Sequence, residues 1–266
     1  MKNVSEQFIL DDYEVFKSGV KKKTGIDLSR YKEAQMKRRL KAFYEKRTFK
    51  SFEDFLHNGL LKNEIVLSDF LERMTINVSE FYRNPKRWEV LNKKIFPKLI
   101  SRSPRLNIWS AACSTGEEPY TASIIAAEHF LSHHRILATD IDNVILKRAK
   151  AGLYTERSLK EMPKEYIEKY FVKESPGYRI KDNIKSAVTF KKHNLLADQY
   201  EKQFDLIICR NVLIYFTETA KEEVFHNFSS SLKPGGILFV GSTEQIFNPA
   251  QFGLTSADTF FYQKTE

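Results

Sequence analysis

Acidic residues stand at the expected ends of two buried strands. The stretch LNIWSAACSTGEEPY (106–120) passes from an apolar run, through a turn of small residues, to the start of a predicted helix that carries Glu117 and Glu118. A second apolar run, RILATD (135–140), ends in Asp140. In folds of alternating strands and helices, ligands bind beyond the carboxyl ends of the strands. These carboxylates are therefore candidates for contacts with a ligand.

The turn after the first run differs from one that holds a pyrophosphate. It contains one glycine, Gly116, where a dinucleotide-binding turn has three. Carboxylates at this helix start repel a pyrophosphate and attract an ammonium group. Ser114 and Thr115 each precede a glutamate by three residues, which predicts a capping box, and Pro119 suits a first helical turn. The pattern favours a ligand with a cationic end.

Two interpretations of Asp140 are open. An acidic residue about 20 residues after such a turn accepts hydrogen bonds from ribose hydroxyls. Alternatively, Asp140 only caps the helix that is expected to begin near Asp142. Together with the acidic turn, ribose binding is favoured. A ribose and an amino-acid ammonium are both present in S-adenosylmethionine.

Polar residues follow two further predicted strands, as residues 193–196 (HNLL) and 209–215 (CRNVLIY). One polar strand end is weak support for a site. Four of them, in the order expected of a doubly wound sheet, indicate one shared site.

The elements that position these residues are strands that alternate with helices. This alternation predicts an α/β fold whose parallel sheet is covered on both faces. Residues 153–190 are charged and carry Pro163 and the turn SPG, which predicts a small β-subdomain inserted into that fold. The predicted strands are LNIWSAA, RILATD, FDLIIC, GILFVGS and the final DTFFYQK, with helices over 117–131, 142–151 and 217–232.

Residues 1–75 predict a separate, all-helical domain. Apolar residues recur there at helical spacing, as in Met36, Leu40 and Phe43, and no proline precedes Pro85. We expect domains at 1–75 and 101–266, joined by a linker over 76–100.

One segment of the helical domain carries the net charge of the chain. The formal net charge is +9, and residues 17–50 hold thirteen Lys and Arg residues against three acidic ones. Charged helix faces are usually only solvated, but this excess suits an acidic partner: a nucleic acid, an anionic membrane or an acidic protein. The cations expected to cluster opposite the apolar stripe are Arg30, Lys37 and Lys41, with Arg38 alongside.

Composition favours a reduced, cytoplasmic protein. No apolar run approaches the roughly 20 residues of a membrane span, and the N-terminus lacks the pattern of a secretory signal. The cysteines are Cys113 and Cys209, and no Cys/His cluster has the spacing of a zinc site, so we expect no metal.

Taken together, the motifs resemble the CheR-type chemotaxis receptor methyltransferases, and within that family the version found in Bacillus-type bacteria. The resemblance implies a class I, Rossmann-like methyltransferase fold with a small helical N-terminal domain. It also implies transfer of a methyl group from S-adenosylmethionine to receptor glutamates, which gives methyl esters and S-adenosylhomocysteine during sensory adaptation. The matching stretches are NVSEFYRN (77–84), SAACSTGEEPY (110–120), ATDID (138–142), KHNLL (192–196), CRNVLIYF (209–216) and the basic helix DLSRYKEAQMKRRL (27–40).

Carried over by motif, the resemblance implies roles for single residues. Arg83 is expected to grip a carboxylate, either that of the substrate or that of the cofactor, with a surface salt bridge as the alternative. Tyr215 is expected to border the transferring methyl group, with simple packing as the alternative. The implied cofactor contacts are Asn77, Ser79, Arg83, Glu117, Asp140, Asn194, Leu195, Arg210 and Asn211.

The resemblance also implies the partner. In some members of the family the β-subdomain binds a peptide of the receptor tail through a loop that contains glycine. The corresponding turn here, ESPGYR, is short and has a single glycine, so we expect the pentapeptide-independent kind. We expect a monomer without nucleic acid or membrane insertion, which contacts the cytoplasmic helices of the receptor through Arg30, Lys37, Arg38 and Lys41.

Two other functions share parts of this pattern. An RNA methyltransferase has the same cofactor fold and uses a basic domain for phosphates. Adenine-N6 enzymes, however, usually carry Asn/Asp-Pro-Pro-aromatic after the fourth strand, where this chain has RNVL (210–213). A non-catalytic sensor binds the cofactor and uses the helical domain as an adaptor, and the intact NVSEFYR and CRN stretches argue against it.

Overall fold

The structure, a computed structural model, describes residues 4–75, 79–129 and 134–265, with the side chains of the first helix described from residue 12. Its contacts divide the chain into two units. The smaller unit holds the helices up to residue 75 together with Leu196–Asp198 and Tyr215–Glu223. The larger unit holds the other described residues.

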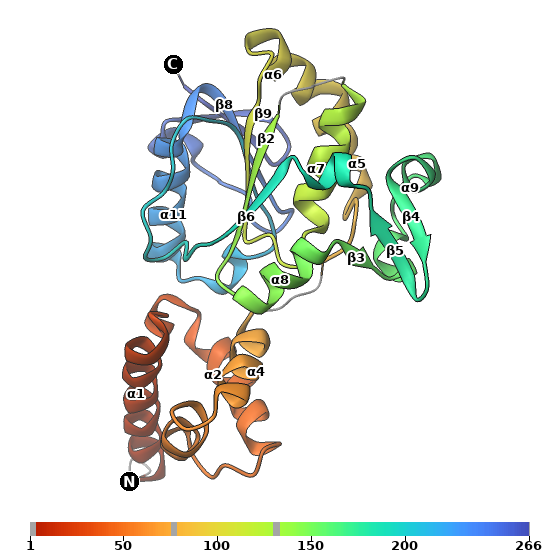
Figure 1. The fold of residues 1–266 in the computed structure, drawn as a ribbon. Coiled ribbons are helices and arrows are strands. Elements are labelled where there is room, and N and C mark those ends of the chain that lie inside the picture. The colour runs from red at the N-terminus through yellow and green to blue at the C-terminus, as the bar shows by residue number, and fades with distance from the viewer. Residues whose placement is uncertain (1–3, 76–78, 130–133, 266) are drawn as a thin grey trace. The chain divides into compact units, whose positions relative to one another are not determined.

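Helices build the smaller unit (Figure 1). They pack around a core of aromatic rings. The rings of Phe16 and Phe55 have their centroids 5.6 Å apart. In the second helix Met36, Leu40 and Phe43 are buried, which confirms the apolar stripe that their spacing predicts. The elements are α1 (Val4–Thr24), a 3-10 turn (Leu28–Arg30), α2 (Glu33–Glu45), α3 (Phe52–Asp54), a π-helical turn (Phe55–Leu60) and α4 (Glu64–Met74).

A seven-stranded sheet forms the centre of the larger unit, with the strand order β6-β2-β1-β7-β8-β10-β9. The first five strands in this order are parallel to one another, and β10 is antiparallel to both β8 and β9. This order confirms the predicted α/β class. The strands are β1 (Asn107–Ala111), β2 (Arg135–Asp140), β6 (Val188–Lys192), β7 (Phe204–Cys209), β8 (Leu232–Val240), β9 (Leu254–Asp258) and β10 (Phe261–Lys264).

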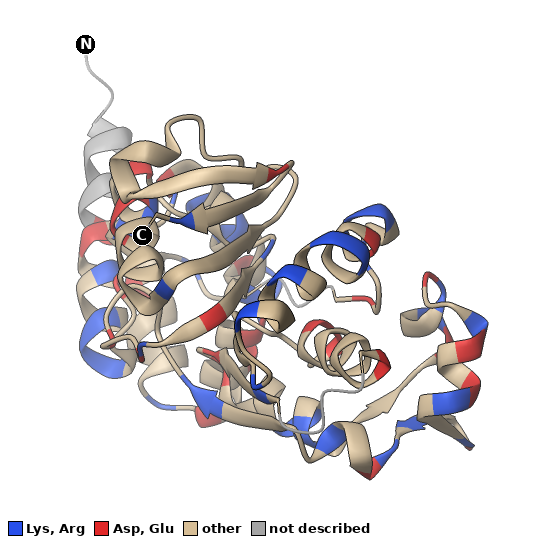
Figure 2. Cartoon of the chain, turned by 90° about the horizontal axis from the view of Figure 1, so that it is seen from above, with Lys and Arg blue, Asp and Glu red and all other residues tan. Residues whose placement is uncertain are grey.

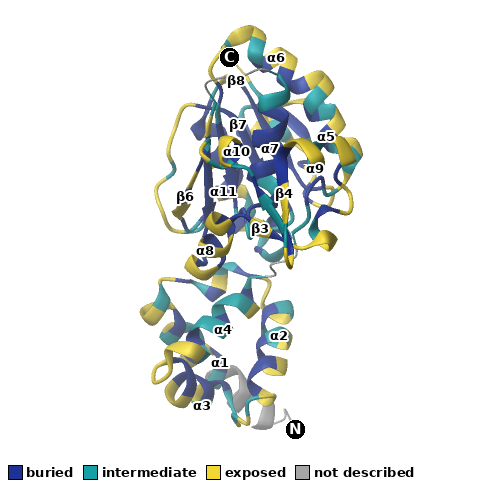
Figure 3. Ribbon diagram, turned by 45° about the vertical axis from the view of Figure 1, so that its right-hand side comes forward, coloured by how far each residue is buried: buried dark blue, intermediate teal, exposed yellow. Residues whose placement is uncertain are grey.

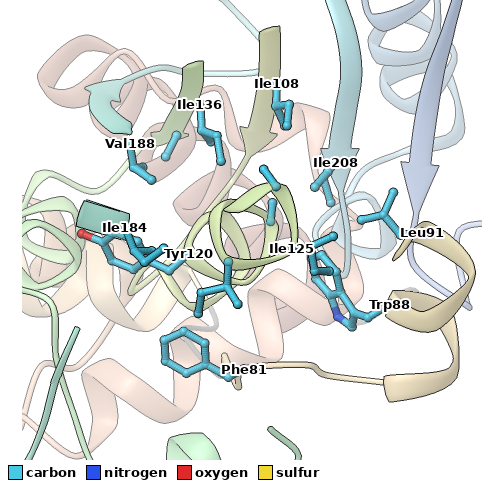
Figure 4. Close-up of a cluster of buried hydrophobic side chains, with 14 of the residues drawn as sticks. Phe81, Trp88, Leu91, Ile108, Tyr120, Ile125, Ile136, Ile184, Val188 and Ile208 are labelled. Atoms are coloured by element: carbon cyan, nitrogen blue, oxygen red, sulfur yellow. The ribbon is translucent and has the colours of Figure 1, made fainter. Parts of the chain in front are cut away.

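Helices cover both faces of this sheet. Successive residues of a strand point to opposite sides, so an apolar strand needs a packed layer on each face. Ile108 belongs to the buried cluster that includes Ile125 of α7 (Glu117–Glu128), which Figure 4 shows in close-up. The next residue, Trp109, packs on Phe228 of α11 (Glu218–Ser231) with ring centroids 5.4 Å apart. Buried residues are dark blue in Figure 3 and line the sheet between these layers.

The described part of the predicted linker is part of the core. It forms α5 (Pro85–Val90), a π-helical segment (Leu91–Ile95) and α6 (Phe96–Arg102). Trp88, Leu91 and Phe96 are at most 1% exposed and belong to the same buried cluster as Ile108. Their spacing of three to five residues places them on one face of the helix, so this segment covers the sheet instead of spanning a gap.

The predicted β-subdomain is confirmed as a separate three-stranded sheet with the order β3-β5-β4 (Figure 1). The main sheet resumes at β6. None of the helices that the structure describes is long and apolar enough to cross a membrane. The elements of this region are α8 (Asn143–Ala151), β3 (Leu153–Tyr154), a 3-10 turn (Glu156–Leu159), α9 (Lys164–Tyr170), β4 (Phe171–Glu174), β5 (Gly177–Ile180) and α10 (Asp182–Lys185).

Candidate active site

The carboxyl ends of β1, β2 and β7 meet at one edge of the sheet. Ala111 lies opposite Thr139 of β2, and Ser110 lies opposite Ile208 of β7. The strand order reverses at β1, which makes this edge a topological switch point, the usual ligand site of open α/β sheets. The predicted residues that follow these three strands therefore share one place in the fold.

Left-handed backbone is concentrated at the same edge. Of the eight non-glycine residues with positive φ in the described part of the chain, five lie in NVSEFYRN, SAACSTGEEPY and CRN. Each such residue costs about 1–3 kcal/mol, and such strain gathers at functional sites. The five are Tyr82, Asn84, Ala112, Ser114 and Asn211, with φ between 49° and 64°.

The turn after β1 has a glycine as the N-cap of α7. Gly116 has φ +94°, and a Cβ placed there would lie 3.0 Å from the hydroxyl of Tyr154. Thr115 Oγ1 donates to Glu117 Oε2 at 2.6 Å, two residues on, instead of capping the helix. The predicted capping box is therefore wrong, because the turn packs too closely on Tyr154 for a side chain at the N-cap. Pro119 does lie in the first turn.

Asp140 is not the cap of α8. That cap is Asp142, whose Oδ1 accepts from the amides of Val144 at 2.7 Å and Ile145 at 3.3 Å. The carboxylate of Asp140 accepts from the amide of Ser114 at 2.9 Å and from the amide of Asp142 at 3.0 Å. It thus ties the end of β2 to the turn after β1. The amide of Ile141 also donates to this carboxylate. Three of its roughly four lone pairs are therefore used, and one is left to accept a ligand hydroxyl.

Burial raises the pKa of three carboxyl groups at this edge. It is the largest cause of the raised pKa of Glu117, Glu118 and Asp140. The pKa of Glu118 rises to about 7 in spite of the opposing charges of Arg210 and Arg83. A cationic ligand would favour the ionised carboxylates and lower these pKa values. The electrostatics therefore suit a ligand with an ammonium group.

One buried acceptor at the edge lacks a protein donor. Asp142 Oδ2 is buried and accepts no hydrogen bond from any residue that the structure describes. Such an atom costs about 1–3 kcal/mol unless a donor reaches it. Hydroxyl donors beside Asp140 and Asp142, with a cation near the acidic helix start, fit the ribose and ammonium of S-adenosylmethionine.

The NVSEFYRN stretch reaches the same edge. A side-chain hydrogen bond joins Ser79 to Glu117. Arg83 is half-buried, and its charge acts on Glu118 and on Arg210. Asn77 lies outside the described residues.

Arg210 points back into the protein. Its guanidinium lies over the rings of Trp88 and Phe239, at 5.4 and 4.8 Å from their centroids. Its Nη2 donates to the carbonyl of Arg83 at 2.8 Å and to Asn84 Oδ1 at 2.9 Å. The side chain of Arg210 thus holds the NVSEFYRN backbone in place, and a contact of this residue with a ligand falls to its backbone.

The remaining predicted contacts lie after β6 and β7. The amide of His193 donates to the carbonyl of Asp140 at 2.9 Å. The chain therefore passes beside the end of β2 after it leaves β6, and Asn194 and Leu195 are the next residues. Leu195 is buried. Asn211 donates its amide to Glu244 Oε2 at 2.7 Å.

Two contacts at the edge have no signal in the sequence. Ser110 Oγ donates to Glu118 Oε1 at 2.9 Å, and the Tyr154 hydroxyl donates to the carbonyl of Thr115 at 2.8 Å. Tyr154 comes from the β-subdomain, 39 residues after its partner, so no local pattern marks it.

In the smaller unit, Tyr215 lies beside the basic helix. The amide of Lys32 donates to the carbonyl of Tyr215 at 2.9 Å. The guanidinium of Arg39 lies 5.0 Å from the centroid of the Tyr215 ring, and Arg39 Nη1 donates to the carbonyl of Met74 at 2.7 Å. Arg39 is a contact of Tyr215 that the sequence analysis missed.

The four predicted receptor-binding cations differ in their surroundings. Arg30 forms an ion pair with Glu223, and Lys41 lies 3.8 Å from Glu45. Lys37 Nζ lies 4.9 Å from the centroid of the Tyr13 ring. Arg38 is exposed and forms no ion pair with any residue that the structure describes. Lys21, Lys22 and Lys23 lie in the last turn of α1. Figure 2 shows the Lys and Arg residues of the chain in blue.

Comparisons with known proteins cover both units. Residues 11–75 match the family described as CheR methyltransferase, all-alpha domain, and residues 77–261 match CheR methyltransferase, SAM binding domain. A chemotaxis protein methyltransferase of Listeria innocua is 45% identical over 256 residues, which are 96% of this chain and 97% of that protein. One of Borreliella burgdorferi is 36% identical over 84% of this chain and 83% of its own length.

Proposed function

The chain belongs to the CheR methyltransferase family, and we propose that it methylates glutamate side chains of chemotaxis receptors. Its methyl donor is S-adenosylmethionine. The observation that carries the proposal is the likeness to a chemotaxis protein methyltransferase over 96% of this chain and 97% of that protein. The acidic edge of the sheet supports it, because its groups suit the ribose and the ammonium of this donor.

The cofactor contacts follow from the edge. We assign the ribose hydroxyls to Asp140, beside the buried Oδ2 of Asp142, and the ammonium to the acidic start of α7 at Glu117. The remaining contacts that we propose are Asn77, Ser79, Arg83, Asn194, Leu195, Arg210 and Asn211.

The reaction needs little acid–base chemistry from the protein. Held at this edge, S-adenosylmethionine would supply the methyl group, which would pass from its sulfonium sulfur to a carboxylate oxygen of the glutamate and leave S-adenosylhomocysteine. The glutamate carboxylate is already anionic at neutral pH, so it needs no general base. The residues of the chain must orient this carboxylate and remove its water, and orientation contributes about 7–11 kcal/mol in favourable systems.

We assign the orienting role to Arg83, because a planar guanidinium matches a carboxylate in a fixed geometry. We place the Tyr215 hydroxyl beside the transferring methyl group. The charge of Arg83 already acts on the carboxyl of Glu118, which supports a position facing the acidic edge.

Receptor recognition falls to the helical domain over residues 1–75. Its cations complement an acidic receptor helix and steer the encounter. We propose contacts through Arg30, Lys37, Arg38 and Lys41, with Lys37 and Arg38 as the principal ones, because Arg30 and Lys41 already face Glu223 and Glu45. The methyltransferase domain then covers residues 101–266, with residues 79–100 packed onto it and the β-subdomain at about 153–190.

We further propose where and in which state the protein acts. The protein acts in the cytoplasm, on the cytoplasmic helical domain of the receptor. It works as a monomer. It needs no receptor-tail peptide, because the turn ESPGYR offers a single glycine.

The test uses S-adenosylmethionine labelled on its methyl group, with a purified receptor cytoplasmic domain and RNA as parallel substrates. We expect label on the receptor that mild alkali removes, since carboxyl methyl esters are labile to base. The label should disappear when the candidate receptor glutamates are changed to alanine.

Label on RNA would favour the RNA methyltransferase alternative, and alkali-stable label on protein would place the methyl group on another side chain. Cofactor binding without turnover on any substrate would favour the non-catalytic sensor.

A further inference from the structure

Glu244 is a buried carboxylate that the proposed chemistry does not use. It follows β8 in the sequence GSTE (241–244), and only 6% of its surface is exposed to solvent. Its Oε2 accepts from the amides of Asn211 at 2.7 Å and Gly241 at 2.9 Å, and its Oε1 accepts from the amide of Leu213 at 2.7 Å. One carboxylate therefore binds backbone amides on two sides of the turn that follows β7.

This turn needs an external support. The strand ladder of β7 ends at Cys209, where it pairs with Val240 of β8. Asn211 has φ +64°, in the left-handed region that is uncommon for non-glycine residues, although asparagine adopts it more readily than most. The hydrogen bonds from Asn211 and Leu213 to one side chain constrain this conformation, since they hold the amides on either side of Val212.

Gly241 leaves the space that the carboxylate occupies. A Cβ at Gly241 would lie 2.3 Å from Glu244 Oε2 and 3.0 Å from the amide nitrogen of Asn211. A side chain there would push the carboxylate away from the turn. The glycine and the glutamate three residues later thus form one arrangement.

We propose that Glu244 is a positioning residue for the cofactor, which fixes the turn at residues 210–213 in its binding conformation. The inference rests on the proposed function, in which Arg210 and Asn211 contact S-adenosylmethionine. Glu244 acts through the backbone of these residues and is not itself placed against the cofactor. A carboxylate is required, because both of its oxygens accept, whereas an amide in its place would turn a donor toward a backbone N–H.

Asp205 offers a matched control. It is buried to a similar degree, at 7% exposure. It accepts from the amide of Asn107 at 2.7 Å and from Lys233 Nζ at 2.8 Å. These contacts lie at the starts of β1 and β7, at the opposite edge of the sheet from residues 210–213. A change at Asp205 therefore tests what the loss of any buried carboxylate does to this unit.

The experiment compares Glu244→Gln, Glu244→Asp and Asp205→Asn with the wild type in the full chain. The dissociation constant of S-adenosylhomocysteine is measured by calorimetry, the KM for a receptor cytoplasmic domain by methyl transfer, and Tm by thermal unfolding. We expect Glu244→Gln to weaken S-adenosylhomocysteine binding about tenfold or more, since it replaces charge-assisted hydrogen bonds with one acceptor and one misdirected donor. The receptor KM should stay within about twofold, and Glu244→Asp should recover part of the affinity.

Asp205→Asn should lower Tm without changing the affinity for S-adenosylhomocysteine by more than about twofold, because the affected edge is remote from the turn. Should Glu244→Gln fail to fold, Gly241→Ala replaces it, since its Cβ displaces the same carboxylate, and the same loss is expected.

The inference is overturned by wild-type affinity in the folded Glu244 or Gly241 variant, or by an equal loss of affinity in Asp205→Asn. A wild-type chain that binds S-adenosylhomocysteine but methylates no receptor would contradict the proposed function instead, and it would leave the role of Glu244 standing.

Discussion

The acidic edge of the sheet and the basic face of α2 use charge in opposite ways. At the edge, Asp140 and Glu244 are buried and accept hydrogen bonds from backbone amides at 2.7–3.0 Å. On the basic face, Arg38 is exposed and Lys41 lies 3.8 Å from a glutamate one helical turn away. Buried charges that are hydrogen-bonded to backbone amides fix the positions of those backbone segments. Exposed charges instead contribute to the electrostatic potential around the protein.

The two regions control different properties of the protein. When a buried carboxylate is removed, the amides that donated to it are left unsatisfied. The resulting loss of free energy is large and confined to that site. An exposed ion pair contributes about 0–1 kcal/mol and is screened by salt. We therefore expect the edge to determine cofactor affinity and the basic face to determine the rate and affinity of the encounter with the receptor.

The largest effect is expected at the edge itself. Asp140→Asn should weaken S-adenosylhomocysteine binding about 100-fold, because it removes an acceptor both from the amide of Ser114 and from the ribose. Calorimetry measures the change. Asp182→Asn, an exposed aspartate in α10, is the control and should bind normally. Similar affinity of the two variants would break the contrast between buried and exposed charge.

The pH dependence of stability sharpens the same contrast. Burial raises the pKa of Glu118 from 4.5 to about 7, so the folded state holds a proton that the unfolded state has released over this range. Stability from this group is present below the unfolded pKa and falls as the pH rises through 7. We expect the difference in unfolding free energy between wild type and Glu118→Gln to shrink by about 2 kcal/mol from pH 5 to pH 8.

Denaturant titrations of both proteins at the two pH values measure this difference. Replacement of Glu174, a carboxyl paired with Arg179 and only partly buried, by Gln should show no comparable decrease. Arg210 Nη1 lies 4.0 Å from Glu118 Oε2. A difference between wild type and Glu118→Gln that grows with pH would show that this ion pair outweighs burial.

Charge reversal on α2 should change receptor recognition alone. Lys37→Glu with Arg38→Glu should raise the KM for the receptor domain about tenfold, because repulsion replaces attraction to an acidic helix. Binding of S-adenosylhomocysteine should change by less than about twofold. The control, Lys160→Glu with Lys164→Glu, makes the same change of charge on exposed lysines of the β-subdomain region. An equal rise in KM for the control would assign recognition to net charge or to the β-subdomain.

The smallest effect is expected for Tyr215. Tyr215→Phe should lower kcat about fivefold, in line with the loss of one hydrogen bond, and leave cofactor affinity unchanged. Tyr178→Phe, which alters a half-buried tyrosine of β5, is the matched control. Unchanged kcat in Tyr215→Phe would leave packing beside Arg39 as the role of this ring.

Much of the fold is predictable because its strongest signals are local. RILATD and FDLIIC coincide with β2 and β7, since a buried parallel strand is a short apolar run between polar residues. The strand β9, LTSAD, has no such run because it lies at the end of the sheet, and the sequence analysis did not predict it. The segment around Trp88 was expected to be a linker. Its apolar residues pack on a sheet whose strands all come later in the sequence, so no neighbouring pattern indicates that packing.

The site is only partly predictable, because its sequence pattern identifies residues and not their contacts. The strand ends predict that Asp140 and Arg210 come to one edge. Which of Asp140 and Asp142 caps α8 depends on where the helix begins, and the two positions differ by two residues. The turn of Arg210 toward the carbonyl of Arg83 joins residues 127 positions apart, and the contact between Glu244 and Asn211 joins residues 33 apart. Such long-range contacts leave no local periodicity.

The claim that the acidic edge determines cofactor affinity and the basic face determines receptor recognition is tested most directly by a salt titration of the wild-type protein. The dissociation constant of S-adenosylhomocysteine and the KM for the receptor domain are measured together at ionic strengths from 0.05 to 0.5 M, over which the screening length falls from about 14 to 4 Å. We predict that the receptor KM rises about tenfold while the cofactor constant stays within about twofold. Equal salt dependence of the two constants would contradict the account.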